Sequence, residues 1–527
     1  MNGWKRALFQ VARQYLSTEA DPLTPGGDLP STPQTVVHML ADAAADTPAA
    51  IALSCTGTEV SYRDYLNSVA ILAHRLTEIG VRGERVALLM ENSLDMAIAM
   101  FAVHAAGAQA VPINPVYTAR ETTYILADSE PVATIHDMSA TDMLANLDSA
   151  GEMIGVEGTS LLQLAIETAV QLPPPPSSDD FATLQYTGGT TGHPKGVNIT
   201  HGQMAVNIAQ REAILPTENQ AETIVCVMPL FHVFAVSMCL HLTVYCRGRL
   251  VILPRYHPQK LCDLLEGESI TILPAGPTIY TGLLNFEGFA STNVENLRWC
   301  YSGSAPLPEE TLRRWEDATG CFILEGYGQT EAGPVLTYNP AVGVKKIGSV
   351  GIPLARTEVE IVDLETGDRV MPDGEAGEIR ARGPQIMSGY RNLPEETATT
   401  LRKGWLYTGD IGKFDGDGYL FLLDRKKEMA IVGGYNVFPR EIDEVLYTHP
   451  AVSEAASVGV PDDYYGEVIK AWVTIAPGDS VTEKELLDYC SENLANYKVP
   501  TEIIIATHIP KTTVGKIDKK KLREQYG

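Results

Sequence analysis

The chain has 527 residues, and its 66 acidic residues outnumber its 40 basic residues to leave a formal net charge of −26. This length predicts about three to four compact units, and a content of 45% hydrophobic and 20% charged residues is typical of a globular rather than a disordered chain. The acidic balance argues against non-specific nucleic-acid binding, which depends on basic residues that neutralise phosphates. A local basic patch would still bind small anions.

At the N-terminus we expect no signal peptide, because the long apolar core and cleavage site are missing. The apolar residues between Trp4 and Tyr15 have the spacing of an amphipathic helix, which we expect to pack on the protein's own surface. Weak peripheral association with a membrane is the alternative.

The eight cysteines are scattered, without a C-x-x-C pair or a repeated His/Cys spacing. We therefore expect reduced, mostly buried thiols, neither a zinc site nor a disulfide framework, and a cytoplasmic location.

Helices and strands alternate over the first part of the chain. Residues Ser61–Gly80 are predicted to form a helix with a serine cap at its start and a glycine stop at its end. The apolar run Val86–Met90 is predicted to be a strand, and a second helix and strand follow at Ser93–Ala106 and Ala110–Ile113. This alternation on short loops is typical of a mostly parallel sheet covered by helices, so the predicted fold class is α/β.

A proline-rich linker, Pro173–Pro176, interrupts this alternation, which then resumes as far as Trp315. Residues Thr223–Tyr245 are apolar over about the length of a membrane span, but Pro229 and two histidines interrupt them. Because such residues are unfavourable in lipid, we expect a buried strand followed by a core helix there and no transmembrane segment.

The pattern changes twice in the C-terminal part. From about residue 347 to residue 423, short alternating runs separated by Gly, Pro and Asp predict a small β-rich subdomain. Later, helices near Pro439 and Thr482 and a strand at Ile503–Ala506 predict an α+β unit of about 100 residues. We therefore expect a large N-terminal domain, 1–423, with subdomains of roughly 1–178, 179–346 and 347–423, followed by a small mobile C-terminal domain, 424–527.

The most informative segment for function is Thr-Gly-Gly-Thr-Thr-Gly-His-Pro-Lys-Gly at 187–196. Its glycines allow close backbone approach to an anion, its threonines add hydroxyl donors, and Lys195 adds a positive charge. The motif follows an apolar strand predicted at Phe181–Gln185. It differs from the common P-loop, in which lysine directly follows glycine, because His193 and Pro194 intervene. These residue types predict a site for phosphate groups.

This motif resembles the Thr/Ser/Gly-rich signature of the adenylate-forming superfamily, which comprises acyl-CoA synthetases, luciferases and peptide-synthetase adenylation domains. Further motifs resemble those of the same superfamily, in the same order, and the resemblance extends from about residue 35 to the end. The segment Pro229–Ala235 and the hinge motif look most like those of bacterial fatty-acyl-CoA ligases. The further motifs are Tyr327-Gly-Gln-Thr-Glu331, Tyr407-Thr-Gly-Asp410, Asp424-Arg-Lys-Lys-Glu428 with Gly434-Tyr-Asn-Val-Phe-Pro-Arg-Glu-Ile442, and Pro510-Lys-Thr-Thr-Val-Gly-Lys-Ile517.

The resemblance implies an acyl-CoA ligase that uses ATP, Mg²⁺ and coenzyme A. Such an enzyme forms acyl-AMP with release of pyrophosphate and then forms acyl-CoA with release of AMP. A medium- or long-chain fatty acid is the expected substrate, because Val233–Leu240 and Ile272–Tyr280, near the presumed pocket, are apolar. An aryl or cyclic carboxylate is the runner-up.

Other activities are less favoured. Adenylation of an amino acid for a carrier protein would need an acidic residue for the α-amine, and Val233–Cys239 has none. A non-catalytic nucleotide-binding relative is disfavoured because the charged motif residues are all present, and nothing in the sequence points to a luciferase-like oxidase. A homo-oligomer is left open.

The resemblance also implies the nucleotide site. Lys195 and the neighbouring hydroxyls would hold the β- and γ-phosphates, and Asp410 would accept both ribose hydroxyls. Glu331 and Thr191 would hold Mg²⁺, a hard cation that prefers oxygen ligands. Tyr327 would stack on adenine, with a core aromatic as the alternative. The full ATP-binding set is Thr187, Gly188, Gly189, Thr190, Thr191, Gly192, Lys195, Ser304, Ala305, Gly326, Tyr327, Gly328, Gln329, Thr330, Asp410, Arg425 and Lys516.

Lys516 and His232 complete the expected catalytic set with Lys195 and Glu331. By resemblance, Lys516 bridges the carboxylate and the α-phosphate during adenylation, and His232 lies near the carboxylate and shifts to admit the thiol. Some long-chain ligases place a tryptophan gate where Val236 stands, so the acyl-chain length is not predicted. The expected acyl pocket comprises His232, Val233, Phe234, Val236, Gly276 and Gly303.

Asp424 is the expected pivot, because expelling pyrophosphate and presenting a thiol require different geometries. Gly433, Gly434 and Tyr435 would then face the pantetheine arm of CoA, with a plain turn as the alternative for the glycine pair. The segment Lys511–Glu524 holds six basic residues against two acidic ones. We expect this positive charge to lie where phosphates arrive.

Overall fold

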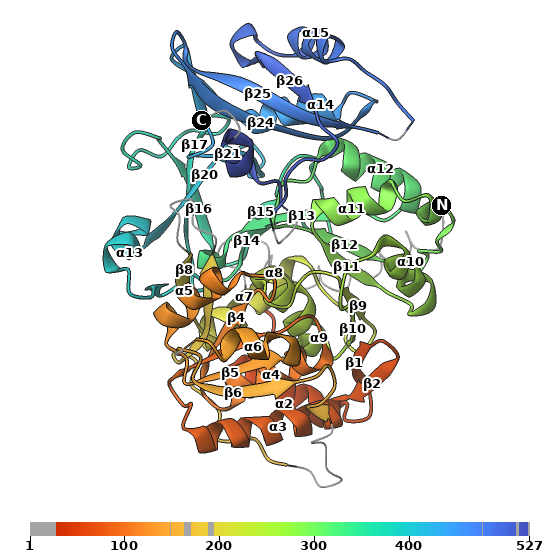
Figure 1. Ribbon diagram of the computed structural model, residues 1–527, viewed down its shortest axis with the longest axis vertical. Coiled ribbons are helices and arrows are strands. Elements are labelled where there is room, and N and C mark those ends of the chain that lie inside the picture. Colours follow the sequence, from red (N-terminus) through yellow and green to blue (C-terminus); the bar gives the residue numbers. More distant parts are fainter. Residues whose placement is uncertain are drawn as a thin grey trace.

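The computed structural model describes residues 28–147, 149–162, 170–187, 194–476, 478–512 and 516–524. Over these residues the fold is α/β, with a large N-terminal part and a smaller C-terminal part, so the predicted fold class is confirmed. Figure 1 shows the C-terminal part in blue at the top of the molecule, above α11 and α12. The helix predicted between Trp4 and Tyr15 lies outside the described residues.

The first sheet runs in the order β18-β8-β7-β4-β3-β5-β6. Its strands from β7 to β6 are parallel, as the alternation of strands and helices predicted, whereas β8 and β18 add to one edge in antiparallel fashion. The strands are β3 (Arg85–Leu89), β4 (Gln109–Ile113), β5 (Ala133–Asp137), β6 (Glu152–Val156), β7 (Phe181–Thr187), β8 (Lys195–Thr200) and β18 (Gly389–Tyr390).

The second sheet runs in the order β15-β14-β13-β12-β11-β9-β10-β1-β2. It is parallel from β13 to β1 and is closed by antiparallel strands at both ends. Its strands are β1 (Ile51–Cys55), β2 (Thr58–Ser61), β9 (Thr223–Cys226), β10 (Arg249–Ile252), β11 (Ile272–Ala275), β12 (Trp299–Ser302), β13 (Ile323–Gly328), β14 (Val335–Tyr338) and β15 (Ile352–Pro353).

Both sheets combine strands from the two sides of the expected boundary at residue 178. Strands β1 and β2 join strands that come after residue 223, and β7 and β8 join β3 to β6. The sheets therefore do not follow the expected subdomain bounds, which were drawn along the chain alone.

The helix predicted at Ser61–Gly80 is confirmed as α3 (Tyr62–Ile79). The Ser61 hydroxyl accepts a hydrogen bond from the Asp64 N–H, and Gly80 has a φ of 88°, which are common ways to satisfy the two ends of a helix. Helix α4 (Leu94–Ala105) is buried along its whole length. It contacts β3 and β4 of the first sheet and β1 of the second, which explains why it has no polar face.

The strand and core helix predicted for residues 223–245 are also confirmed. Strand β9 is followed by α8 (Val233–Ala235), the π-helical turn η3 (Val236–His241) and α9 (Leu242–Tyr245), which we call together the pocket helix. A π-helical turn inside an α-helix is frequent at functional sites. In the described part of the chain, none of the helices combines the length and hydropathy needed to cross a bilayer.

The remaining helices of the N-terminal part cover these sheets or connect their strands. Their bounds are α2 (Val36–Asp46), α5 (Ala119–Ser129), η1 (Met138–Ala140), α6 (Thr141–Leu144), α7 (His201–Ile214), α10 (Pro258–Gly267), α11 (Pro277–Leu284), η4 (Glu287–Ser291), α12 (Glu309–Thr319) and η5 (Thr330–Ala332).

The β-rich segment predicted from residue 347 forms a third, antiparallel sheet. Its order is β16-β17-β20-β19, and β21 pairs with β20. The elements are β16 (Glu358–Val362), β17 (Gly377–Arg382), α13 (Pro394–Thr400), β19 (Leu401–Arg402), β20 (Trp405–Phe414) and β21 (Leu420–Arg425).

The C-terminal part has its own sheet and its own hydrophobic core. The predicted helix starts at Pro439 and Thr482 are confirmed, and Thr482 forms a capping box with Glu485. Its elements are β22 (Ala430–Val432), β23 (Tyr435–Val437), α14 (Pro439–Tyr447), β24 (Val452–Asp462), β25 (Gly466–Ile475), α15 (Glu483–Asn493), η6 (Asn496–Lys498), β26 (Glu502–Ile505) and α16 (Lys519–Glu524). The eight cysteines of the chain are buried free thiols.

Candidate active site

Asp410 forms a partly buried polar contact with two residues from other strands. Its Oδ2 accepts a hydrogen bond from the Tyr327 hydroxyl at 2.7 Å, and its Oδ1 lies 3.4 Å from Arg425 Nε. The β20–β21 register places Asp410 opposite Arg425, and β13 supplies Tyr327. Burial raises the pKa of Asp410, whereas the Arg425 charge and the Tyr327 hydroxyl lower it. A carboxylate held in this way can accept hydrogen bonds from a diol. The stacking of Tyr327 on adenine remains a prediction.

Glu331 lies in a second cluster with Tyr390 and Lys195. Its Oε1 accepts a hydrogen bond from the Tyr390 hydroxyl at 2.8 Å, and Lys195 Nζ lies 5.2 Å from the centre of the Tyr390 ring. Lys195 also forms an ion pair with Glu396 of α13. Burial raises the pKa of Glu331, while the Tyr390 hydroxyl and the Lys195 charge lower it. The negative charge of Asp410 raises the same pKa, which links the two clusters electrostatically.

The glycine-rich motif joins the β7 and β8 arms of a hairpin. Thr187 and Lys195 are partners across this hairpin, so they stand at the two ends of the loop. This agrees with the predicted place of the motif after a strand. Gly188, Gly189, Thr190, Thr191 and Gly192 lie outside the described residues, so their predicted roles remain predictions.

Lys516 reaches this region from the C-terminal part. Burial lowers its pKa to about 8, the Arg425 charge lowers it as well, and the Asp410 charge raises it. Burial also lowers the pKa of His232 to about 3, and the Lys516 charge contributes. His232 Nδ1 accepts a hydrogen bond from the Phe234 N–H at 3.2 Å, at the start of the pocket helix. The structure therefore brings together three predicted site residues, Asp410, Lys516 and His232.

Several predicted glycines have a clear packing reason. A Cβ at Gly326 would lie 2.3 Å from Tyr338 Cε2, and one at Gly328 would lie 1.8 Å from the Pro334 carbonyl oxygen. A Cβ at Gly303 would lie 2.8 Å from the Phe234 ring. Gly328 therefore requires glycine whether or not a nucleotide is bound, and a side chain at Gly326 or Gly303 would displace a neighbouring aromatic ring.

The remaining residues predicted for the nucleotide lie on connections that follow β12 and β13. Gln329 and Thr330 lead into η5, which carries Glu331. Ser304 adopts a φ of 70°, and its buried Oγ has no hydrogen-bond partner in the described part of the chain. Ala305 comes next in the chain. An unpartnered buried hydroxyl destabilises the folded chain, so Ser304 Oγ is a candidate to form a hydrogen bond with a ligand.

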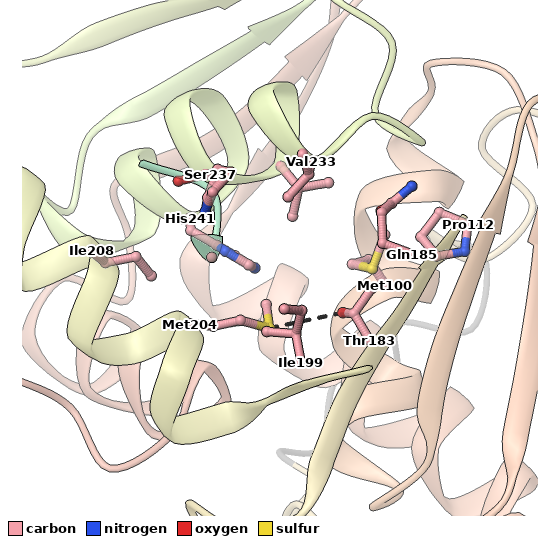
Figure 2. Close-up of a pocket in the computed structure, with 13 residues that line it drawn as sticks. Met100, Pro112, Thr183, Gln185, Ile199, Met204, Ile208, Val233, Ser237 and His241 are labelled. Atoms are coloured by element: carbon pink, nitrogen blue, oxygen red, sulfur yellow. Dashed lines mark hydrogen bonds between the residues drawn. The ribbon is translucent and has the colours of Figure 1, made fainter. Parts of the chain in front are cut away.

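A pocket extends along the pocket helix, directly after His232 in the chain. Figure 2 shows side chains of the first sheet, α7 and the pocket helix converging on it. Two of the predicted acyl residues, Val233 and Val236, line it. Phe234 instead packs against Gly303, and Gly276 precedes α11 beside Met228. Further apolar lining comes from Met100, Ile199 and Ile208, and polar lining from Thr183, Gln185, Ser237 and His241.

The residues predicted to bind CoA lie elsewhere. Gly433 and Gly434 form the β22–β23 turn with φ values of 57° and 86°. The Gly433 N–H donates to the Tyr465 carbonyl at 2.8 Å, and Tyr435 stacks on Tyr497 with ring centres 4.6 Å apart. These contacts are all within the C-terminal part. Among the described residues, the contacts of this turn do not include Asp410, whereas Lys516 acts on Asp410 electrostatically.

Asp424 connects the N-terminal and C-terminal parts. Its Oδ1 accepts a hydrogen bond from the Arg425 N–H at 2.8 Å, and its Oδ2 accepts one from the Arg440 N–H at 3.0 Å. Arg440 belongs to α14, so the Asp424 side chain joins β21 to the C-terminal part. Its role as a pivot remains a prediction.

Two residues of the site are absent from the predicted set. Tyr390 holds Glu331, and Glu396 pairs with Lys195. Neither lies in a recognised motif, and the only local signal was an aromatic residue after Gly389. Tyr390 reaches the site because β18 pairs with β8, a contact between segments about 190 residues apart: Tyr390 is opposite Val197.

Comparison with known proteins agrees with this geometry. The AMP-binding enzyme family matches residues 40–391, and the AMP-binding enzyme C-terminal domain matches residues 441–516. Since the first match alone covers more than half of the chain, the chain belongs to the AMP-binding enzyme family. The predicted superfamily is thereby confirmed.

Individual relatives identify the class of enzyme within this family. The chain is 35% identical to a long-chain-fatty-acid–CoA ligase of Bacillus subtilis (strain 168), over 94% of this chain and 96% of the relative. It is 37% identical to a feruloyl-CoA synthase of an Amycolatopsis species, over 91% of this chain and 97% of the relative. Among solved structures, ATP-bound MatB from Rhodopseudomonas palustris matches with a TM-score of 0.87 and 32% identity, over 94% of this chain and 99% of that one. The predicted class, an AMP-forming carboxylate–CoA ligase, is confirmed, and ATP and CoA are the substrates of this class.

Proposed function

We propose that the chain joins an apolar carboxylic acid to CoA through an acyl-AMP intermediate, with a medium- or long-chain fatty acid as the first candidate. The observation that carries this proposal is the position of Lys516. It lies within electrostatic reach of Asp410 and Arg425 on one side and of His232 on the other. The pocket helix begins directly after His232. A cation at this point can bridge a ribose-bound phosphate and a carboxylate held at the mouth of the pocket.

In the first half-reaction a carboxylate oxygen attacks the α-phosphorus of ATP, and pyrophosphate leaves. The barrier is largely electrostatic, so positioned cations contribute most to the rate. Asp410 accepts the ribose hydroxyls, and Lys516 neutralises the carboxylate and the α-phosphate as they approach each other. Lys195 binds the β- and γ-phosphates after exchanging its contact with Glu396 for phosphate oxygens.

The residues present also fit a magnesium ion bound with the nucleotide. Mg²⁺ is usually held by one or two carboxylates together with substrate phosphates. Glu331 is a partly buried carboxylate beside Lys195, and only its Oε1 accepts the hydrogen bond from the Tyr390 hydroxyl. Glu331 would hold the ion, with the predicted ligand Thr191 outside the described residues. When bound, the ion would neutralise charge on the phosphates.

The second half-reaction requires a different arrangement. The CoA thiol attacks the acyl carbon of acyl-AMP, and AMP leaves. The interactions of Lys516 with Asp410 and His232 support an arrangement for adenylation, and the described contacts of the Gly433–Tyr435 turn are with other residues of the C-terminal part. We therefore propose that rotation about Asp424 withdraws Lys516 and presents this turn to the pantetheine arm. The glycines provide a path without side chains, and the neutral His232 side chain yields to the thiol.

The identity of the acid rests on the pocket. Its apolar lining supports a fatty acid, as does the similarity to the long-chain-fatty-acid–CoA ligase. An aryl acid is the second candidate, because Thr183, Gln185, Ser237 and His241 are polar and because a feruloyl-CoA synthase is a relative of similar identity.

The experiment is a panel of straight-chain acids from two to eighteen carbons together with aryl acids, assayed for AMP release that depends on both ATP and CoA. The proposal predicts AMP and the acyl-CoA with at least one apolar acid. Formation of ADP, or no AMP with any acid, would contradict it.

A further inference from the structure

Three histidines lie together where the pocket meets the protein core. His241, the last residue of η3, lines the pocket, and Figure 2 shows its imidazole pointing from the pocket helix into the cavity. The ring centre of His104, on α4, lies 6.5 Å from that of His241 and 5.3 Å from that of His201, on α7. His104 Nε2 also lies 3.4 Å from Oγ1 of Thr183, another pocket residue. We call these three side chains the histidine cluster.

The histidine cluster is buried but incompletely hydrogen-bonded. His104 and His201 are fully buried, and His241 is 2% exposed. Within the described part of the chain, Nε2 of His241 and both ring nitrogens of His201 have no hydrogen-bond partner. Buried polar atoms are nearly always satisfied, because an unmade hydrogen bond in the interior is costly. An unpartnered nitrogen of a pocket-lining residue therefore indicates a ligand group that the pocket is built to receive.

The charge state of the histidine cluster indicates which kind of ligand group it can bind. Burial, together with the neighbouring imidazoles, lowers the pKa of His241 and of His201 to about 3. The rings are therefore neutral near pH 7, and each offers one donor and one acceptor. A neutral imidazole pairs well with a hydroxyl, which also donates and accepts, but it does not offset the charge of a second carboxylate.

The geometry points to a substrate with an oxygen at its far end. We propose that His241, supported by Thr183 and Ser237, binds a hydroxyl group carried by the carboxylic acid at the end remote from its carboxylate. The inference rests on the proposed function, because it assumes that the carboxylate lies at His232. His232, the N-cap of the pocket helix, and His241 are nine residues apart, which is roughly 13 Å along the axis of an α-helix. This spacing suits a hydroxyaryl acid or a medium-chain acid that is hydroxylated at its end.

The test compares matched acids that differ only in that hydroxyl. For the wild-type enzyme, kcat/KM is measured for 4-hydroxycinnamate against cinnamate and for 8-hydroxyoctanoate against octanoate. We expect the hydroxylated member of at least one pair to be favoured by about 10-fold or more, because a site built to hydrogen-bond a hydroxyl discriminates strongly against its absence. Equal values, or a preference for the plain acid in both pairs, would overturn the proposal.

Two variants assign this preference to His241. His241→Phe keeps a ring beside Phe101, whose centre lies 5.7 Å from that of His241, and is expected to lower the hydroxyl preference about 10-fold. His241→Gln keeps a donor and an acceptor and should retain more of the preference. His136→Phe is the matched control, because His136 is buried away from the pocket with its Nδ1 2.9 Å from the Asp137 carbonyl oxygen. A preference unchanged in His241→Phe would overturn the assignment, and if that variant fails to fold, the wild-type ratio still decides the proposal.

The outcomes separate this inference from the proposed function. If no acid yields AMP, the proposed ligase activity itself is wrong. If plain acids are converted as well as hydroxylated ones, the ligase stands and only the hydroxyl site is wrong.

Discussion

Lys516 has the most informative surroundings of any single residue in the site. It comes from the C-terminal part, yet its pKa is set by burial, by Arg425 and by Asp410, and its charge acts on His232. A lysine in a partly desolvated place binds anions more strongly than one in water. The proposed adenylation role therefore follows from its environment as well as from its motif.

The half-reactions should respond differently to loss of this amine. We expect Lys516→Ala to slow ATP–pyrophosphate exchange about 100-fold or more, because the variant loses a preorganised charge at the transition state. Thioester formation from supplied acyl-AMP should be unaffected. Lys520→Ala is the matched control, because the Lys520 side chain is 75% exposed and pairs with Glu524 in the same helix. If both half-reactions survive in Lys516→Ala, the role given to Lys516 is wrong.

The lowered pKa of Lys516 predicts an alkaline limit to adenylation. The amine is charged below its pKa of about 8 and neutral above it, so kcat/KM for adenylation should fall as the pH rises through about 8. ATP–pyrophosphate exchange measured from pH 6 to pH 10 checks this. Lys516→Arg keeps its charge throughout that range, so any residual activity of this variant should lack the decline. A wild-type profile that stays flat to pH 10 would contradict the assignment.

At the scale of elements, β18 is the short strand that completes the phosphate end of the site. It pairs with β8 just beyond Lys195 and thereby places the Tyr390 hydroxyl on Glu331. Helix α13 follows and supplies Glu396 to Lys195. The glycine-rich hairpin is thus supported by a segment far away in the sequence.

Tyr390→Phe should weaken the use of ATP. The hydroxyl lowers a Glu331 pKa that burial raises, so its loss raises this pKa further and Glu331 remains protonated to higher pH. We expect kcat/KM for ATP to fall about 10-fold or more and the acidic limb of the pH profile to move upward. Tyr407→Phe is the control, because the Tyr407 hydroxyl donates to the Gly367 carbonyl at 2.9 Å, away from Glu331. An unshifted acidic limb would count against Glu331 as an ionised ligand.

Local signals in the sequence predicted the helices and strands well, but contacts between residues far apart in the chain could not be predicted. The caps of α3 and the capping box of α15 involve residues three apart, so a local pattern could identify them. The pairing of β1 with β10 joins residues about 200 apart, as Leu53 with Leu250, and no periodicity encodes it. The same holds for the site. Motif residues such as Asp410 and Lys516 were predicted, whereas Tyr390 and the histidine cluster depend on tertiary packing.

At the scale of the whole molecule, we expected the positive charge of residues 511–524 to lie where the phosphates arrive, but most of this charge is used in ion pairs. Apart from Lys516, the basic residues of this segment are paired with carboxylates. Three of these pairs, those with Glu454, Asp443 and Glu428, join the segment to other elements of the C-terminal part. From residues 511–524, the phosphates are therefore expected to meet Lys516 alone rather than a basic patch. The pairs are Lys511 with Glu454, Lys519 with Asp443, Lys520 with Glu524, Lys521 with Asp518 and Arg523 with Glu428.

A cross-link between the two parts tests whether they must move. Asn285 Nδ2, after α11, donates to Ser453 Oγ, in β24, at 3.3 Å. We expect cysteines at these two positions to be joined by a short bifunctional maleimide reagent with a reducible disulfide in its spacer, and the native cysteines are buried and do not compete. The cross-linked Asn285→Cys, Ser453→Cys variant should retain ATP–pyrophosphate exchange and lose thioester formation. Reductant should restore it, and the single variants serve as controls. Thioester formation at the wild-type rate in the cross-linked form would show that no rotation is needed.

The central claim is that the carboxylate itself attacks the α-phosphorus of ATP at this site. The direct measurement supplies an accepted acid with both carboxylate oxygens labelled with ¹⁸O, together with ATP and CoA, and determines the label in the nucleotide by mass spectrometry. The account predicts AMP that carries one labelled oxygen, unlabelled pyrophosphate and one acyl-CoA for each AMP. Unlabelled AMP, or ADP with labelled inorganic phosphate, would contradict it.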